Sequence, residues 1–364
     1  MVTRKSLPLG ASLRRLTSSK ERRDAEIGRF AAAIVLSWVR AGRARRAHGK
    51  PPWHPADLHA FPPRGDGGLF RSSIERLLME LVLARPGSAA CLHLANENFL
   101  ALEALTARRP APSRQAVLGT VERATERFVR ALVRTPRAVR RAGGRLARSG
   151  TRLVCYAPGP LVEEALRAAR RRRRRIIVSV SEGRPDLAGA AAAARLARGG
   201  LRVEIFSDAA LFHGLEGAAA LVLEAHAVSR DGAIAAAGSA GLAELAASRR
   251  VPVVVACGPE AHLPPALAAF IREEAAPGRP SKRRAASRPT YRFPRFDLTP
   301  LELIQRLLTP WGLLAREEAA ALLGNLRCSP RLQRALVGRL GRPQVPPRRA
   351  RRVRRRGRSS RRRR

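Results

Sequence analysis

The first part of the chain carries its apolar residues at helical spacing. Between Glu21 and Val39, apolar side chains recur every three or four residues, which is typical of the buried face of an amphipathic helix. The same spacing predicts further helices at 69–84, 89–107, 113–134 and 139–148. Residues 49–68 are rich in Pro and Gly and indicate a loop. We therefore expect a helical domain over residues 21–148.

At Thr151 the pattern changes to short β-rich runs that alternate with helical segments. The expected strands are 153–156, 176–181, 201–206, 219–223 and 251–256. The expected helices between them are 161–172, 187–198 and 239–249. Strands that alternate with helices of this length are typical of βαβ units, which build a parallel sheet with right-handed crossovers.

The C-terminal part combines a helix signal with a segment of low apolar content. After a basic, Pro- and Ser-rich linker at 275–288, Thr299, Pro300 and Glu302 have the residue types of a helix N-terminus, so we expect a helix to open there. From Gly341 onward Pro and Arg dominate, and such a segment buries too little apolar surface to fold alone, so we expect a disordered basic tail. The expected organisation is a basic flexible arm, a helical domain, a sheet domain and an Arg/Pro-rich tail, at 1–20, 21–148, 149–330 and 331–364.

Composition adds an extreme positive charge to this α/β pattern. The 364 residues are 45% hydrophobic, which is enough for two folded domains, and their formal net charge is +43. The excess of arginine over lysine is compatible with a GC-rich genome as well as with selection for a polyanionic partner. In both cases the surface attracts nucleic acid with a steep salt dependence. The candidate nucleic-acid contacts are Arg351, Arg352, Arg354, Arg355, Arg356, Arg361, Arg362, Arg363 and Arg364.

Other classes of protein are disfavoured by what the sequence lacks. The four cysteines, at 91, 155, 257 and 328, are widely separated, and no CxxC pair suggests a zinc site or a disulfide framework. We therefore expect a cytoplasmic protein with no metal and no cofactor. No apolar run approaches the ~18 residues that a membrane span requires.

Five short segments follow one another in order along the chain. They are 84–88 (ARPGS), 143–151 (GGRLARSGT), 180–185 (VSEGRP), 206–210 (FSDAA) and 296–314, which begins FDLTP. Together they resemble the family that joins the regulatory alpha, beta and delta subunits of translation initiation factor 2B to isomerases of methylthioribose 1-phosphate and ribose 1,5-bisphosphate. The resemblance implies a Rossmann-like parallel sheet flanked by helices behind the helical domain. It also implies a homodimer or assembly with related subunits.

The residues that carry isomerase chemistry in that family are replaced here. The isomerases have a cysteine just beyond the first sheet strand, where this chain has Tyr156, and Cys155 falls one residue early, on the opposite face. His226 stands where the resemblance puts the catalytic aspartate, and 233–237 is apolar where an Asn-Lys pair helps hold the sugar phosphate. Because aldose–ketose isomerisation needs groups that move protons, we expect no intact catalytic set and a non-catalytic regulatory or scaffold protein.

A ligand site is still expected at the carboxyl ends of the strands, where open parallel sheets bind their ligands. The candidate contacts to a phosphorylated sugar or nucleoside monophosphate are Arg85, Glu182, Arg184 and Asp208. Two local alternatives stay open, in which Glu182 and Arg184 form an ion pair that stabilises their loop, and Asp208 caps a short helix at 209–216.

Two other functions stay open. A divergent sugar-phosphate isomerase would use Cys155 and His226 as an activated nucleophile pair, against the alternative of a buried cysteine and an unrelated histidine. An RNA- or ribosome-associated protein would act through the tail, with the sheet domain as an assembly core. Because only 4% of the residues are aromatic, its RNA binding would be electrostatic and tolerant of sequence. The run 170–175 is expected at the other end of the sheet, as a solvated turn or an anion contact.

Overall fold

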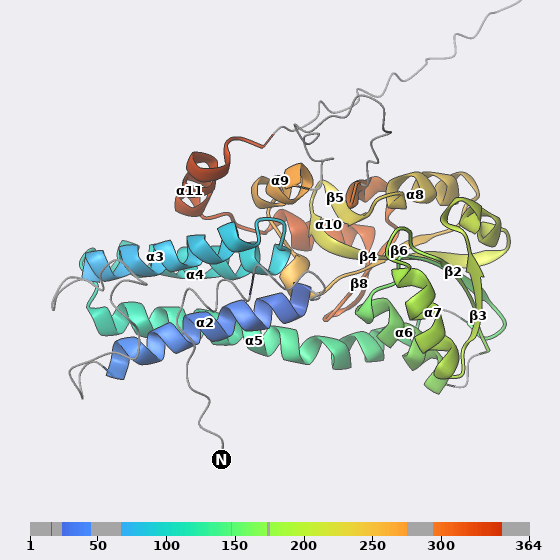
Figure 1. Cartoon of the computed structure of the whole chain (residues 1–364), viewed down its shortest axis with the longest axis horizontal. Helices are drawn as coiled ribbons and strands as arrows, with labels where there is room; N and C mark the ends of the chain where they lie inside the picture. Colours follow the sequence, from blue (N-terminus) through green and yellow to red (C-terminus); the bar gives the residue numbers. More distant parts are fainter. Residues whose placement is uncertain are drawn as a thin grey trace, which may run out of the picture.

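The computed structural model describes residue 16 and residues 24–44, 67–146, 148–172, 175–274 and 294–343. It confirms the expected α/β architecture, with a helical N-terminal part followed by a mainly parallel sheet flanked by helices (Figure 1). The basic arm at 1–20, apart from residue 16, the linker at 275–288 and the tail beyond 343 lie outside the described residues. Within the described part, no helix is long and apolar enough to cross a membrane.

Among the described residues, four long helices form the N-terminal part. They are α2 (Asp24–Ala44), α3 (Gly67–Ala84), α4 (Ala89–Arg108) and α5 (Arg114–Gly143). Serine side chains cap two of them, because Ser88 accepts the Cys91 N–H at the start of α4 and Ser113 accepts the Ala116 N–H at the start of α5. Their apolar faces meet in one core that includes Ile27, Trp38, Leu78, Leu92, Val121 and Leu132.

Helix α5 is longer than the sequence predicts. The two helices expected at 113–134 and 139–148 are one helix, which continues through Pro136 and reaches α6 beside the sheet (Figure 1). A proline inside a helix removes a hydrogen bond and adds a steric conflict. Here Leu132 packs into the helical core on one side of Pro136, while Val139 packs into the core of the sheet on the other. Burial at both ends keeps the helix continuous.

The main sheet has the strand order β3-β2-β1-β4-β6-β8-β9, and all its pairs are parallel except β8 with β9. Its strands are β1 (Arg152–Tyr156), β2 (Ile177–Ser181), β3 (Arg202–Phe206), β4 (Ala218–Ser229), β6 (Val253–Ala256), β8 (Arg306–Thr309) and β9 (Gly312–Ala315). The helices that accompany it are α6 (Pro160–Arg171), α7 (Ala188–Arg198), α8 (Ser239–Ser248), α9 (Pro265–Glu274) and α10 (Arg316–Gly324). Three short 3-10 helices are η2 (Asp208–Leu215), η3 (Pro259–Ala261) and η4 (Leu301–Leu303).

Each strand sends alternate side chains into two different cores. In β1, Leu153 and Cys155 belong to the core under α6 and α7, whereas Val154 belongs to the core under η2 and α8. The β4 strand alternates in the same way, with Val222 on the α6 side and Leu223 on the α8 side. This period of two decides which cavity each residue at a strand end can reach.

The prediction that a helix begins at Thr299 is wrong. Residues Phe296–Pro300 form strand β7, which pairs antiparallel with β5 (Gly232–Ala236), and β5 in turn pairs with the extended end of β4. Thr299 is fully buried opposite Ala233 in this ladder. The residue types of a helix cap are local signals, and pairing with a distant strand overrides them here.

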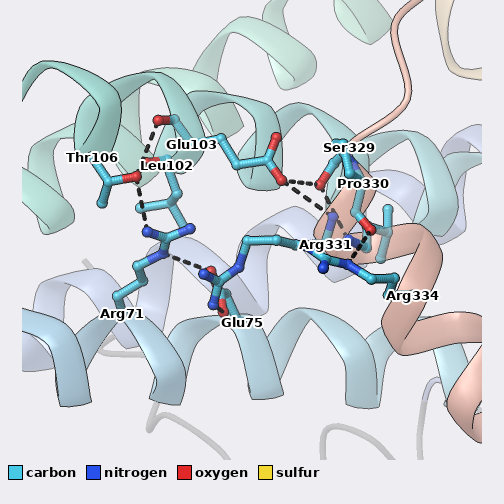
Figure 2. Close-up of polar contacts among 10 residues, drawn as sticks. Arg71, Glu75, Leu102, Glu103, Thr106, Ser329, Pro330, Arg331 and Arg334 are labelled. Carbon is cyan, nitrogen blue, oxygen red and sulfur yellow. Dashed lines mark hydrogen bonds and ion pairs between the residues drawn. The ribbon is translucent and has the colours of Figure 1, made fainter. Parts of the chain in front are cut away.

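The C-terminal helix α11 (Pro330–Leu340) returns to the helical part and packs beside α3 and α4 (Figure 2). Residues 331–340, which composition places in the tail, therefore lie in a helix. Glu103 on α4 accepts hydrogen bonds from the Ser329 hydroxyl at 2.7 Å and the Arg331 N–H at 3.3 Å, at the first turn of α11. The Arg331 guanidinium reaches Glu75 on α3 at 2.8 Å, and Arg71 contacts the same carboxylate at 2.7 Å.

We expect Glu103→Ala to lower the free energy of unfolding by about 1–2 kcal/mol, because the Ser329 hydroxyl and the start of α11 lose their carboxylate acceptor. Urea unfolding measures this loss. The matched control is Glu126→Ala, which removes an exposed ion pair with Arg130 and should cost less than about 0.5 kcal/mol. Equal losses in the two variants would show that Glu103 does not hold α11.

Candidate functional site

The carboxyl ends of β1, β4 and β6 face the helical part across a cavity of about 390 Å³. Its lining comes from α2, from the part of α5 that ends at Pro136, from the start of α6, from β4, β5 and β7, and from residues that follow β1 and β6. The polar and charged lining residues are Asp24, Glu26, Arg29, Thr135, Glu224, His226 and Glu260. This cavity lies at the crevice where ligands of open parallel sheets bind.

Glu224, on β4, is a half-buried carboxyl group in this lining. Its Oε2 accepts the Val162 N–H at 2.9 Å, so the carboxylate caps the N-terminus of α6. The approach requires Gly159, because a Cβ at that position would overlap the Glu224 carboxyl group. Burial raises the pKa of Glu224 from 4.5 to about 7, and its backbone hydrogen bonds oppose the increase.

Glu260, in η3 after β6, faces the same cavity from the neighbouring strand end. Its side chain is 8% exposed, and Oε2 has no hydrogen-bond partner within the described part of the chain. Burial raises the pKa of Glu260 to about 7; Asp24 raises it further, while Arg29 lowers it. The charge of Glu260 also raises the pKa of Glu224, so the two carboxyl groups resist ionising together.

The loop between α3 and α4 contacts two residues of the cavity lining, Asp24 and His226. Asp24 at the start of α2 accepts the Ala90 N–H at 2.8 Å and also the Ser88 hydroxyl, so it caps α4. His226 Nε2 contacts the Gly87 carbonyl oxygen at 2.6 Å, and its ring stacks on Phe296 with centroids 4.6 Å apart. Helix N-termini attract anions, but carboxylates of the chain itself already cap both α4 and α6.

Three of the four predicted ligand contacts come together at the ends of β2 and β3, and none of them is in the lining of this cavity. Asp208 accepts the backbone N–H groups of Gly183 and Arg184 at 2.8 and 2.7 Å, rather than capping η2 with its side chain. Arg184 pairs with Glu182 at 3.2 Å and its side chain is 65% exposed. Arg85 follows α3 instead, where its Nε donates to the Leu16 carbonyl at 2.8 Å.

The Cys155 and His226 side chains occupy different environments. Cys155 is fully buried in the core under α6, where burial raises its pKa to about 12 and keeps the thiol protonated at neutral pH. His226 lines the cavity and is held by Gly87 and Phe296. Tyr156 turns to the opposite side of the sheet from Cys155, and its hydroxyl donates to the Ala237 carbonyl at 2.6 Å.

Sequence reasoning missed the two glutamates that dominate the cavity. Glu224 directly follows the apolar run 221–223, and Glu260 follows the run 253–257 after one Gly and one Pro. Their positions at the ends of adjacent parallel strands were the available signal. Among the described residues, no group of three or more His, Cys, Asp or Glu side chains is arranged to hold a metal ion.

Residues 60–316 match the model of the family described as "Initiation factor 2 subunit family". The translation initiation factor eIF-2B of Pyrococcus horikoshii OT3 is similar in structure, with TM-score 0.61, 19% identity, and coverage of 86% of this chain and 100% of that one. The tetrameric eIF2B-beta2-delta2 complex of C. thermophilum contains a chain with TM-score 0.61, 17% identity, and coverage of 88% and 96%. The 5-methylthioribose 1-phosphate isomerase of the same Pyrococcus gives TM-score 0.56, 13% identity, and 86% coverage of both chains. No curated protein matches this chain in sequence.

We expect the raised pKa values of Glu224 and Glu260 to make the protein less stable as the pH rises. Between pH 4.5 and about 7 the folded state holds protons that the unfolded state has released, so the free energy of unfolding falls across this window. The expected loss is on the order of 3 kcal/mol for the buried Glu260 and smaller for the half-buried Glu224, because solvent screens part of its shift. Glu224→Gln keeps an acceptor for Val162 but does not ionise, so its stability should fall less.

Urea unfolding at pH 5 and pH 8 measures the difference between parent and variant. The control is Glu126→Gln, whose carboxylate is exposed on α5 and pairs with Arg130. If the parent and Glu224→Gln lose the same stability between the two pH values, then Glu224 is ionised in the folded state throughout.

Proposed function

The chain belongs to the initiation factor 2 subunit family, and from this premise we propose that it is a non-catalytic regulatory or scaffold protein acting in the cytoplasm. The fold by itself is shared by initiation factor 2B subunits and by an isomerase. The observation that favours a regulatory protein over an isomerase is the Glu224 carboxylate, which caps the N-terminus of α6. It occupies the position that the fold offers to an anionic substrate, and its charge disfavours a phosphate there.

The state of the candidate nucleophile supports this proposal. A nucleophilic thiol reacts as the thiolate, and it needs a lowered pKa and access to substrate. Cys155 has neither, because it is fully buried and its pKa is raised to about 12. His226 contacts a backbone carbonyl and an aromatic ring instead of a thiol.

We also propose that a phosphate ligand binds at the loop that contains Glu182, Arg184 and Asp208. The ion pair between Glu182 and Arg184 is exposed, and such pairs contribute about 0–1 kcal/mol, so a phosphate oxygen can replace Glu182 as the partner of Arg184. Asp208 would hold the loop in place through the N–H groups of Gly183 and Arg184. A phosphorylated sugar or a nucleoside monophosphate fits this description.

We also propose that the chain assembles as a homodimer or with related subunits. One similar structure is a tetrameric complex of two kinds of initiation factor 2B subunit. Two exposed apolar side chains of the sheet part are candidates for such an interface: Ile205 on β3 is 55% exposed, and Trp311 between β8 and β9 is 61% exposed.

RNA or ribosome binding through the tail is the second candidate function, and charge favours it. Residues 342–364 contain thirteen arginines and no acidic residue. The candidate contacts at 351–364 lie outside the described residues. Flexible cationic segments bind polyanions by releasing counterions, so this activity is compatible with a non-catalytic fold.

We expect the full-length chain to show no turnover of methylthioribose 1-phosphate or ribose 1,5-bisphosphate, because Cys155 is inaccessible and Glu224 repels phosphate. A coupled assay with a known isomerase as positive control measures this. Residual turnover that is lost in both Cys155→Ala and His226→Ala, while both variants keep their folded circular dichroism spectrum, would replace the proposal with a divergent isomerase.

We expect removal of residues 342–364 to abolish most of the affinity for RNA and to flatten its salt dependence by several units of the log–log slope. Fluorescence anisotropy with a structured and an unstructured RNA, from 50 to 300 mM salt, measures both effects. The matched control replaces three arginines of the folded part, Arg198, Arg249 and Arg250, by glutamine. An equal loss of affinity in this control would assign RNA binding to the folded surface instead.

A further inference from the structure

One face of helix α5 carries a line of exposed arginines. The structure describes every residue between Val121 and Gly143, and the exposed ones are Val133, Pro136 and six arginines. The spacing of these arginines alternates between four and three residues, so they lie within about 80° around a helix of 3.6 residues per turn. We call them the α5 arginine stripe, and they are Arg123, Arg127, Arg130, Arg134, Arg137 and Arg141.

The stripe is long enough to contact an extended partner. Arg123 and Arg141 are five turns apart, which corresponds to about 27 Å along the helix axis. The helix continues through Pro136, so the line of arginines is not interrupted there. Helix α5 runs along one edge of the molecule toward α6 (Figure 1). The stripe therefore presents its charge as a line along this edge.

The described part of the chain neutralises little of this charge. Among the described carboxylates, only Glu126 pairs with a stripe residue, Arg130, at 3.3 Å. Like charges at this spacing on a helix repel one another, and an anionic partner relieves the repulsion. The stripe arginines whose side chains make no ion pair and no hydrogen bond within the described residues are Arg127, Arg134, Arg137 and Arg141.

The basic surface continues beyond the end of α5. The Arg172 side chain, which follows α6, lies against Gly144, which follows α5. Next along the chain, a cavity of about 640 Å³ lies at the amino ends of β2 and β3. Its lining includes Arg170, Arg175 and Arg202, and none of its lining residues is acidic. An extended anion on the stripe could therefore follow positive charge past α5.

We propose that the α5 arginine stripe binds the phosphate backbone of a double-stranded nucleic acid. A duplex carries one negative charge about every 1.7 Å along its axis, so phosphates are within reach of each arginine of the stripe. Guanidinium groups bind phosphate oxygens through two parallel hydrogen bonds. Because the contacts go to the backbone, this binding tolerates any base sequence. The site goes beyond the proposed regulatory function, and it is separate from the tail at 342–364.

The exposed face of α5 favours a duplex over a membrane, a protein or a single strand. A helix that binds a membrane surface inserts its apolar face into the lipid, but the apolar face of α5 is buried, with Leu132 in one core and Val139 in another. Protein interfaces and single strands commonly rely on exposed aromatic side chains. On α5, all of which is described, the only large apolar side chain that is exposed is Val133.

The experiment replaces four stripe arginines by glutamine in the full-length chain. Glutamine has a helix propensity close to that of arginine. The replaced residues are Arg127, Arg134, Arg137 and Arg141. Fluorescence anisotropy from 50 to 300 mM salt measures binding to an RNA duplex and to a DNA duplex of about 20 base pairs. Each lost phosphate contact removes slightly less than one unit of the log–log salt slope, so we expect the slope to fall by about three units for one duplex or both.

Two further variants separate local contacts from net charge. The matched control replaces four exposed arginines of other elements by glutamine, and we expect it to lower the slope by less than about one unit. These four are Arg198, Arg230, Arg250 and Arg327. Lysine at the four stripe positions keeps the charge, so this variant should keep the slope within about one unit of the parent. Thermal melting verifies that each variant is folded.

The proposal is overturned if the full-length chain binds neither duplex, if the control lowers the slope as much as the stripe variant does, or if lysine lowers it as much as glutamine. It is also overturned if the glutamine variant keeps duplex binding but loses binding to phosphatidylserine vesicles, which would assign the stripe to a membrane surface. These variants leave the tail and the cavity at the strand ends unchanged, so failure of this site and failure of the proposed function are distinguishable.

Discussion

Helix α5 packs into two hydrophobic cores at once, and this constraint determines where the site forms. Leu132 and the residues before it belong to the core of the helical part, whereas Val139 and Ala142 belong to the core of the sheet under α6. The turn between them, which contains Thr135 and Pro136, lines the cavity. Because α5 is buried in both cores, it holds the carboxyl ends of the strands against the helical part. Figure 1 shows α5 bridging the two parts.

Two carboxylates of the chain occupy helix N-termini near the crevice. Parallel sheets with helices place helix N-termini at the ligand crevice, where their N–H groups attract anions. In this chain Glu224 caps α6 and Asp24 caps α4, so the fold supplies these anions itself. Each contact also connects two elements within one part of the molecule, because Asp24 links α2 to α4 and Glu224 links β4 to α6.

Much of the fold was predictable because its signals are periodic and local. The apolar spacing from Ile27 to Trp38 predicted α2, and the alternation of short apolar runs with helices predicted the parallel sheet from β1 to β6. Predictions from isolated residue types were weaker. Thr299 and Pro300 have the character of a helix cap but belong to β7, because the ladder with β5 buries Thr299 completely. The two helices expected at 113–134 and 139–148 are one helix, which two cores keep intact through Pro136.

By itself, the sequence determined the α/β class, the family resemblance and the strongly basic charge. Each of these follows from residue types or from spacing along the chain. Only the tertiary structure decided that Glu224 caps α6 and that Glu260 Oε2 is buried with no hydrogen-bond partner in the described part of the chain. The same structure placed Cys155 in a core, out of contact with the cavity. The physical reason is that desolvation and hydrogen bonding depend on neighbours far away in sequence. Only the tertiary packing of helices and strands brings those neighbours together.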